Sequence, residues 1–208
     1  MSNDNNKNNS CKKIILNGLL NKNPILVSGM VIAPVIVLAN NFNDAVMLVI
    51  SFSLITFFTL LVSSFVPKSI VYTIRIILYT LIGALVYVPA VILLKYFMPD
   101  GVESLGIFFP LFITNSFIVT RSESMFFRET KGKMLLDIVF CIIGYDAAVL
   151  IFAVVREILA SGTIGGRMTG MPAFFRVFER PFGGFILLGL FAALFRSILL
   201  LVKRVRQK

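Results

Sequence analysis

Residues 45–67 read AVMLVISFSLITFFTLLVSSFVP and contain no charged side chain. The hydrocarbon core of a bilayer requires about 20 consecutive, mostly apolar residues in each helix that spans it. This stretch meets that requirement, and five further windows come close to it. They are residues 23–43, 76–94, 104–120, 138–155, which Asp146 interrupts once, and 181–195, which can continue past Arg196 to Val202. We therefore predict an all-α integral membrane protein with six transmembrane helices.

The composition agrees with this prediction and excludes most other classes of protein. Of 208 residues, 58% are hydrophobic and 14% are charged, and the mean hydropathy is +0.93. Soluble domains average about 45–50% apolar and about 25% charged residues. The chain has no His and only two Cys, which excludes His-ligated haem, His-containing zinc sites, Ser-His-Asp triads and four-cysteine clusters within one chain. We expect no metal site and no catalytic residue in this chain alone.

The charged residues indicate domain limits and orientation. Residues 1–22 form a polar, Asn-rich tail, residues 23–203 a single six-helix transmembrane domain, and residues 204–208 a basic tail. Most Lys and Arg residues lie in the two tails and in the loops near Lys68 and 121–133, and such an excess marks the cytoplasmic side. We therefore expect both termini in the cytoplasm and a multi-pass protein of the cell (inner or plasma) membrane. The net charge of +10 flanks the helices, so we expect the lipid bilayer as a partner and no nucleic acid.

An odd number of helices in each half makes any internal repeat an inverted one, so we predict two inverted three-helix repeats. Binding sites in such folds tend to lie where corresponding helices are short or interrupted by Pro or Gly. The corresponding helices are the first and the fourth, and both are predicted to be broken. The predicted half-helix breaks are marked by Pro34, Asn40, Pro110, Thr114 and Asn115. Ordinary proline kinks in membrane helices would give the same pattern.

One carboxylate lies within a predicted span. Asp146 is in the middle of the fifth window, and an ionisable residue inside a membrane is by default a functional candidate. It could bind a cation or relay a proton, or it could be a structural hydrogen-bonding partner of the Asn residues in the broken helices. Arg121 and Glu123, at the end of the fourth helix, are two residues apart, so we expect them to have different partners. Arg156-Glu157 is expected to be an interfacial anchor.

Three segments together carry a family resemblance, and they lie at the broken helices and at the end of the fifth helix. The segments are 23–27 (NPILV) with Ala33-Pro34 and Asn40, 104–116 (SLGIFFPLFITNS) running to Arg121-Ser122-Glu123, and 156–164 (REILASGTI). They resemble the six-span membrane subunits of Rnf and of the Na+-translocating NADH:quinone oxidoreductase (Nqr). The nearer match is the E-type subunit of Rnf or the D-type subunit of Nqr. The resemblance covers nearly the whole chain from Asn23 onward.

The resemblance implies both a fold and a function. Subunits of this family are inverted three-plus-three repeats, and each pairs with a homologous six-span subunit. Electrons from reduced ferredoxin or NADH cross the membrane domain, and this transfer is coupled to pumping of Na+ or H+. Each chain of the pair offers two cysteines from the breaks of its first and fourth helices, and the four together hold a [2Fe–2S] cluster.

This sequence departs from the family at the cluster positions, which are occupied by Ala33 and Ser116. Neither residue replaces a thiolate ligand of an iron–sulfur cluster. Cys11, in the polar tail, and Cys141, in the fifth helix, are expected to be an incidental thiol and a packing residue. The sequence SGTI at 161–164 resembles the sequence that accepts a covalent flavin in other subunits of these complexes, but it lacks the Ala-Thr ending. We therefore expect that this chain alone binds no cofactor and that the shared [2Fe–2S] cluster is missing here.

Two interpretations of these substitutions stay open: a divergent subunit of a variant complex, and a decayed copy. We favour the variant subunit because the Pro and Asn residues of both breaks are intact. The leading hypothesis is a membrane subunit of an ion-translocating electron-transport complex, with no catalysis by the chain alone. The alternatives are a small six-span transporter or substrate-binding component without a redox function, which the fourth-helix segment disfavours, and a stand-alone membrane enzyme.

Overall fold

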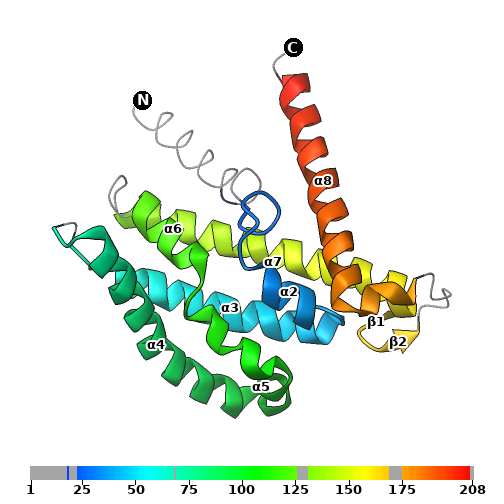
Figure 1. The fold of residues 1–208 in the computed structure, drawn as a ribbon, viewed down its shortest axis with the longest axis horizontal. Helices are drawn as coiled ribbons and strands as arrows, with labels where there is room; N and C mark the ends of the chain where they lie inside the picture. The colour runs from blue at the N-terminus through cyan, green and yellow to red at the C-terminus, as the bar shows by residue number, and fades with distance from the viewer. Residues whose placement is uncertain (1–17, 19–22, 68, 126–130, 169–174, 207–208) are drawn as a thin grey trace, which may run out of the picture.

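The chain is predominantly helical in the computed structural model, which describes residues 18, 23–67, 69–125, 131–168 and 175–206. A two-stranded antiparallel hairpin, in which Thr163 pairs with Met168, follows the longest helix. The elements, labelled in Figure 1, are α2 Ile32–Leu38, α3 Phe42–Ser63, α4 Tyr72–Phe97, α5 Pro99–Leu105, η2 Gly106–Phe108, η3 Pro110–Phe112, α6 Ser116–Met125, α7 Lys131–Ser161, β1 Thr163–Ile164, β2 Arg167–Met168, η4 Arg176–Glu179 and α8 Pro181–Arg206.

Four of these helices, α3, α4, α7 and α8, are long and apolar enough to cross a membrane. A fifth span results if Pro99–Phe108 and Pro110–Ser124 are taken as one segment, which bends by 64° at its break. The first predicted window, in contrast, contains a turn at 24–28 and then the short helix α2. The described residues therefore give four or five candidate spans, while the six spans and the inverted repeat stay predictions.

The long helices extend beyond the charge-free windows that predicted them. α4 begins at Tyr72 and so includes Arg75, and α7 runs from Lys131 to Ser161 and so includes Asp137 and Arg156. A charged side chain is tolerated near the end of a membrane helix when it is paired or reaches the interface. Each of these three side chains has such a partner, as described below, and the helices therefore continue past them.

α3 is the central helix and packs against α2, α4, α5, α6 and α7. Its Phe52 is fully buried, and the ring of Tyr145 on α7 lies 4.0 Å from the Phe52 ring between centroids. Phe112 of η3 and Phe117 of α6 lie 5.9 and 6.1 Å from Phe52. This aromatic cluster fixes the broken fourth segment against the two long helices, because edge-on and tilted ring contacts are favourable beyond simple burial.

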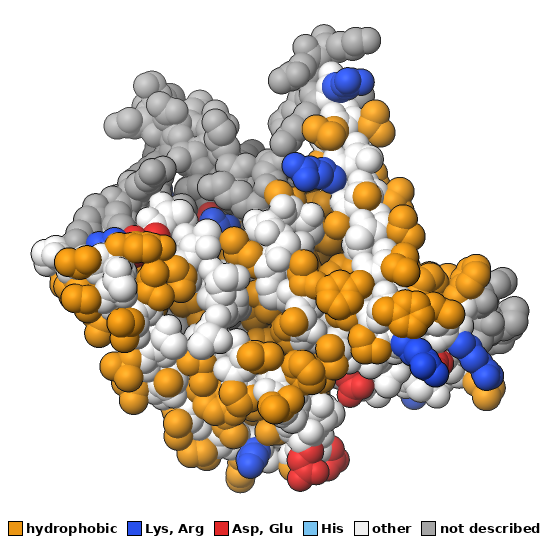
Figure 2. Space-filling view, viewed as in Figure 1, with side chains coloured by type: hydrophobic (Ala, Val, Ile, Leu, Met, Phe, Trp, Pro, Cys, Tyr) orange, Lys and Arg blue, Asp and Glu red, His pale blue; other side chains and the backbone are white. Residues whose placement is uncertain are grey.

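α8 departs from this group of helices, as Figure 1 shows at the C-terminal end of the chain. Its buried residues lie near its start, at Gly183, Gly184, Leu187 and Leu188, and most of its later residues are exposed. On the face shown in Figure 2, hydrophobic side chains are spread over α4, α8 and the surface between them, and few charged side chains lie among them. A surface of this kind suits a bilayer or other membrane helices, since large exposed apolar patches are unusual on soluble proteins.

The predicted tails lie mostly outside the described residues. Of residues 1–22 only Gly18 is described, so Cys11 and the predicted orientation of the N-terminal tail fall outside. At the other end, α8 continues through Arg206, so the predicted basic tail begins within the last turns of this helix. Residues 207–208 fall outside.

Candidate functional site

The first broken segment is interrupted before its proline rather than at it. Gly29 and Val31 both adopt left-handed backbone conformations, with φ of 64° and 59°, and they separate the turn at 24–28 from α2. A positive φ is unusual for a β-branched residue such as Val31. Pro34 lies in the first turn of α2, where a helix has no intrahelical use for a backbone N–H. Pro34 therefore marks the start of a half-helix, and the break itself is made by the two residues with positive φ.

Asn23 fixes the turn that precedes this break. Its Oδ1 accepts hydrogen bonds from the backbone N–H groups of Ile25 and Leu26, both at 3.1 Å. Its Nδ2 donates to the carbonyl of Gly144 in α7 at 2.7 Å, and the side chain is buried. Asn23 thus caps the turn and fastens it to α7, which is how a membrane-buried helix end satisfies its backbone groups.

The second broken segment uses the same devices. Gly106, with a φ of 46°, ends α5, and Pro110 opens η3. Asn115 then caps α6, because its Oδ1 accepts from the backbone N–H of Phe117 at 2.9 Å. The approach to α4 is close here: a Cβ on Gly83 would lie 3.1 Å from the carbonyl oxygen of Ile113. Gly83 therefore allows α4 to pass against the exposed backbone of the break.

Of the five predicted break residues, two make side-chain hydrogen bonds to the backbone of the half-helices. Asn115 is the N-cap of α6, and Asn40 donates from Nδ2 to the carbonyl of Val37 at the end of α2, at 2.9 Å. Pro34 and Pro110 each begin a helical segment. Thr114 is exposed on the surface of this chain. Residues of the first break, among them Met30, also face α6 across a hollow of about 220 Å³, and Arg121 is one of the residues that line it.

Arg121 and Glu123 have different partners, as predicted. Arg121 forms an ion pair with Asp137 of α7 at 3.3 Å, and its guanidinium also contacts the sulfur of Cys141. Both charged side chains of this pair are buried. Glu123 instead accepts two hydrogen bonds from Arg75 of α4, at 3.0 and 2.7 Å. These two pairs attach the end of α6 to α7 and to α4.

Tyr79 strengthens the second of these attachments. Its hydroxyl donates to Oε1 of Glu123 at 3.0 Å, and the residue is fully buried in α4. Glu123 is therefore the acceptor for two residues one turn apart on the same helix. Hydrogen bonds to a charged group contribute about 1.5–3 kcal/mol each, so the position of α6 against α4 is well determined.

The expectation that Arg156-Glu157 is an interfacial anchor is wrong, because both side chains are buried, that of Arg156 fully. Nη1 donates to the carbonyls of Ile36 and Ala39 at the end of α2, at 2.6 and 3.2 Å. Nε and Nη2 donate to carbonyls of the η4 segment: Phe178 at 2.8 Å, and Glu179 and Arg180 at 3.4 Å. A positive charge at the carboxyl end of α2 also complements the helix dipole. Arg156 therefore joins α7, α2 and the entry to α8.

Glu157 performs the complementary task on the neighbouring backbone. Its Oε2 accepts from the backbone N–H of Phe42, the first residue of α3, at 2.8 Å. Its Oε1 accepts from the hydroxyl of Thr163 and from the backbone N–H of Gly166, at 2.9 and 3.2 Å. A carboxylate at the amino end of α3 is favourable for the same electrostatic reason. Glu157 thus fixes the start of α3 and the β1–β2 hairpin.

Asp146 is the central residue of α7, and its partner is not an asparagine of the broken segments. Its Oδ2 accepts a hydrogen bond from the hydroxyl of Ser53 on α3 at 2.6 Å. Its Oδ1 has no hydrogen-bonding partner within the described part of the chain. The side chain lines an open groove of about 490 Å³ between α3 and α7. No group of three or more His, Cys, Asp or Glu residues that could hold a metal ion occurs among the described residues.

Comparison with known proteins identifies the family. A family model described as "Rnf-Nqr subunit, membrane protein" matches residues 11–201. The chain belongs to the Rnf-Nqr family. It is 28% identical over 159 residues to the D-type subunit of the Na(+)-translocating NADH-quinone reductase of Haemophilus ducreyi, an alignment that covers 76% of this chain and 77% of that protein. It is 30% identical over 155 residues to the E-type subunit of the ion-translocating oxidoreductase complex of Aliivibrio fischeri, with 74% and 68% covered.

The resemblance predicted from sequence is therefore confirmed. This Rnf-Nqr family member is a membrane protein with several apolar spans, and its relatives are subunits of ion-translocating oxidoreductases. The two positions at which the family resemblance implies cluster cysteines begin the two half-helices: Ala33 lies in the first turn of α2, and Ser116 is the first residue of α6. Both are exposed on the surface of this chain. A methyl group and a neutral hydroxyl do not fit an iron–sulfur cluster, whose ligands are thiolates.

Proposed function

We propose that this Rnf-Nqr family member is a membrane subunit of an ion-translocating electron-transport complex, and that it pairs there with a homologous six-span subunit. The observation that carries the proposal is the family match along residues 11–201. The two broken segments support it further, because their turns and half-helices are capped by Asn23, Asn115 and Arg156. A decayed copy would be expected to lose such buried capping groups, since nothing would maintain them against mutation.

The finer architecture is part of the same proposal. The segment 23–38 counts as the first span and 99–125 as the fourth, which gives six spans in two inverted repeats of three. The excess of Lys and Arg in the tails and in two loops supports cytoplasmic termini in the cell membrane. The coupling ion is Na+ or H+, and Asp146 is the candidate for its binding or relay.

Affinity purification tests the proposal directly. The full-length chain, tagged and expressed at its native level, is extracted from membranes in a mild detergent and purified. We expect a second six-span Rnf-Nqr chain and flavin-containing subunits to co-purify at fixed ratios, and electron transfer from ferredoxin or NADH to accompany them. A chain that purifies alone with a bound small molecule would instead favour the small transporter considered above.

The same purified complex is expected to contain no [2Fe–2S] cluster that depends on this chain. The reason is that Ala33 and Ser116 supply no thiolate at the half-helix starts. Iron determination and electron paramagnetic resonance spectroscopy after dithionite reduction measure this content. A stoichiometric [2Fe–2S] signal that disappears when this chain is removed would contradict the expectation.

Replacement of Asp146 is expected to reduce ion transport more than electron transfer. Asp146→Asn keeps the size of the side chain and removes its negative charge. An interaction with a charged group is worth about 1.5–3 kcal/mol, so we expect the affinity for the coupling ion to fall at least roughly tenfold. Reconstituted vesicles with Na+- and H+-selective ionophores measure the transport and identify the ion. Asp100→Asn, at an exposed position in the first turn of α5, is the control. Unchanged transport in Asp146→Asn would remove Asp146 from the mechanism.

A further inference from the structure

One oxygen of the Asp146 carboxyl group is enclosed by the chain itself. Asp146 is the middle residue of α7 and contributes to the α3–α7 groove, but its Oδ1 has almost no exposed surface. Oδ2 accepts a hydrogen bond from Ser53, and Oδ1 receives none within the described residues. A metal ion at Oδ1 would need room for itself and for its other ligands, whereas a proton becomes part of the carboxyl group. The enclosure therefore favours a proton.

The surroundings of Asp146 also supply few oxygen ligands. Hard cations are held by several oxygen atoms at once, about six for Mg²⁺ and about six to eight for Ca²⁺. In membrane transporters, Na+ takes ligands from the carbonyls of unwound helix segments. Ser53 and Asp146 instead lie inside the continuous helices α3 and α7, whose carbonyls accept hydrogen bonds within the helix. Among the described residues that line the groove, Ser53 is the only polar one besides Asp146. One hydroxyl and one carboxyl group suffice for a proton but not for Na+.

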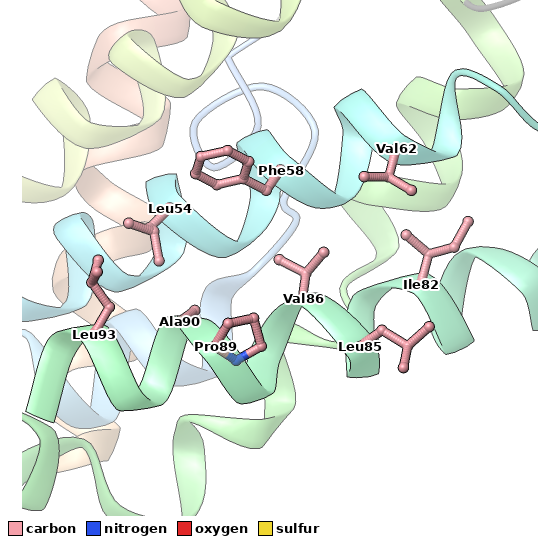
Figure 3. A pocket seen from close by; sticks show the side chains of 9 residues that line it. All are labelled: Leu54, Phe58, Val62, Ile82, Leu85, Val86, Pro89, Ala90 and Leu93. Atoms are coloured by element: carbon pink, nitrogen blue, oxygen red, sulfur yellow. The ribbon is translucent and has the colours of Figure 1, made fainter.

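The adjacent surface of α3 offers no further polar side chain. A second groove, of about 460 Å³, lies between α3 and α4 and is lined only by apolar residues. Figure 3 shows Leu54 and Phe58 of α3 on one side of it and Val86 and Pro89 of α4 on the other. Leu54 lines both grooves, so the two surfaces are neighbours. A ligand set for a cation is therefore not completed from this side.

The charged residues of the described chain lie away from Asp146. On α7 the nearest are Asp137 and Arg156, about 14 and 15 Å away along the helix, and α3 has only Asp44, in its first turn. The neighbouring Tyr145 is uncharged and packs on the ring of Phe52. In the other elements that pack against α7, the charged residues are either paired elsewhere or exposed: Arg121, Glu123, Arg176, Glu179 and Arg196. A carboxylate buried without a counter-charge is costly, and binding a proton removes that charge.

We propose that Asp146 takes up and releases H+, and that Na+ does not bind at this position. The inference rests on the proposed function, because it assigns an ion to the carboxyl group that the complex is expected to use. Uptake forms an O–H bond on the carboxylate and gives a neutral carboxylic acid. Release breaks that bond and returns the proton to water, and the carboxylate regains its negative charge.

Infrared spectroscopy of the purified complex tests this inference. A neutral carboxyl group has a C=O stretching band that a carboxylate lacks, and the band shifts when H2O is replaced by D2O. The difference between the wild type and Asp146→Asn isolates the band of Asp146. We expect this band to be present at neutral pH, to disappear as the pH is raised, and to follow the same curve in NaCl and in KCl. Asp100→Asn replaces an exposed carboxylate and is expected to show no such band at neutral pH.

Ser53→Ala identifies the band without replacing the carboxyl group. It removes the hydrogen bond to Oδ2 of Asp146, so we expect the band to remain and to move to higher frequency. Ser64→Ala is the matched control, because the hydroxyl of Ser64 donates to the carbonyl of Leu61 in the same helix. It is expected to leave the band unchanged.

Three results from an intact complex overturn the inference and leave the proposed function standing. The first is no band of Asp146 at any pH, and the second is a band that persists at every pH at which the complex is stable. The third is a titration curve that lies at lower pH in NaCl than in KCl, since Na+ would then compete with the proton. A wild-type chain that purifies without other subunits removes the proposed function and the inference with it.

Discussion

Replacing Arg156 with leucine is expected to produce the largest loss of stability among the proposed substitutions. Five backbone carbonyls, two at the end of α2 and three in or beside η4, each lose a donor at once, and of these the carbonyl of Arg180 keeps the backbone N–H of Gly184. Water does not readily replace the donor, because the side chain is fully buried. Each buried acceptor left without a partner costs about 1–3 kcal/mol. We expect the free energy of unfolding to fall by about 4 kcal/mol or more, measured by thermal or dodecyl sulfate unfolding of the detergent-solubilised protein.

Two variants control for the loss of a positive charge. Arg167→Leu removes an exposed arginine from β2 and is expected to change stability by less than about 0.5 kcal/mol. Arg156→Lys keeps the charge, but its ammonium has three donors and lacks the planar fork of a guanidinium, so we expect an intermediate loss. Equal stability of Arg156→Leu and Arg167→Leu would show that the carbonyl contacts do not fasten α2 and η4.

The second large effect is expected at the buried ion pair of Arg121 and Asp137. Asp137→Leu leaves the guanidinium buried without its carboxylate, and breaking a buried pair in this way costs about 3–5 kcal/mol. The double replacement Arg121→Met/Asp137→Leu removes both charges and is expected to recover more than half of that loss. A double-mutant cycle on the unfolding free energy measures the coupling between the two residues.

Glu103→Leu is the matched control for this cycle, because it removes an exposed carboxylate from α5. It is expected to be nearly neutral. Additive effects of the Arg121 and Asp137 replacements would contradict an ion pair between them. A strong coupling would show that each charge stabilises the attachment of α6 to α7 only while the other is present.

The membrane class and the approximate positions of the long helices could be predicted from charge-free windows alone. The windows missed the helix ends, and the reason is specific. Arg75 interrupts the window for α4, yet Glu123 of α6 neutralises it at 2.7 Å. Lys131 lies over the ring of Phe65 at 4.7 Å at the start of α7. A count of charges cannot distinguish an unpaired charge, which ends a span, from one paired with a residue far away in the sequence.

The candidate site could be predicted only in part for the same reason. Asn115 lies directly before α6, so its capping function follows from local sequence. The break at Gly29 and Val31 was attributed to Pro34, which is the more conspicuous signal but begins α2 instead. Arg156 was underestimated because its acceptors are 22 to 24 and 117 to 120 residues away along the chain. A charged residue directly beyond the end of a predicted span, adjacent to one of opposite sign, is the only local signal for such a function.

The departure of α8 from the other helices has a mechanical consequence. The helix is held at Gly184, which lies against Arg156 and Ile36, and also at Phe191, Ala192 and Phe195, which pack against the core. Residues 196–206 extend beyond these contacts, and at 1.5 Å per residue they span about 17 Å. A rotation of about 10° about Phe195 would therefore displace the Arg206 end by about 3 Å. A small tilt of the packed part of α8 would thus reach its far end as a displacement of several ångströms.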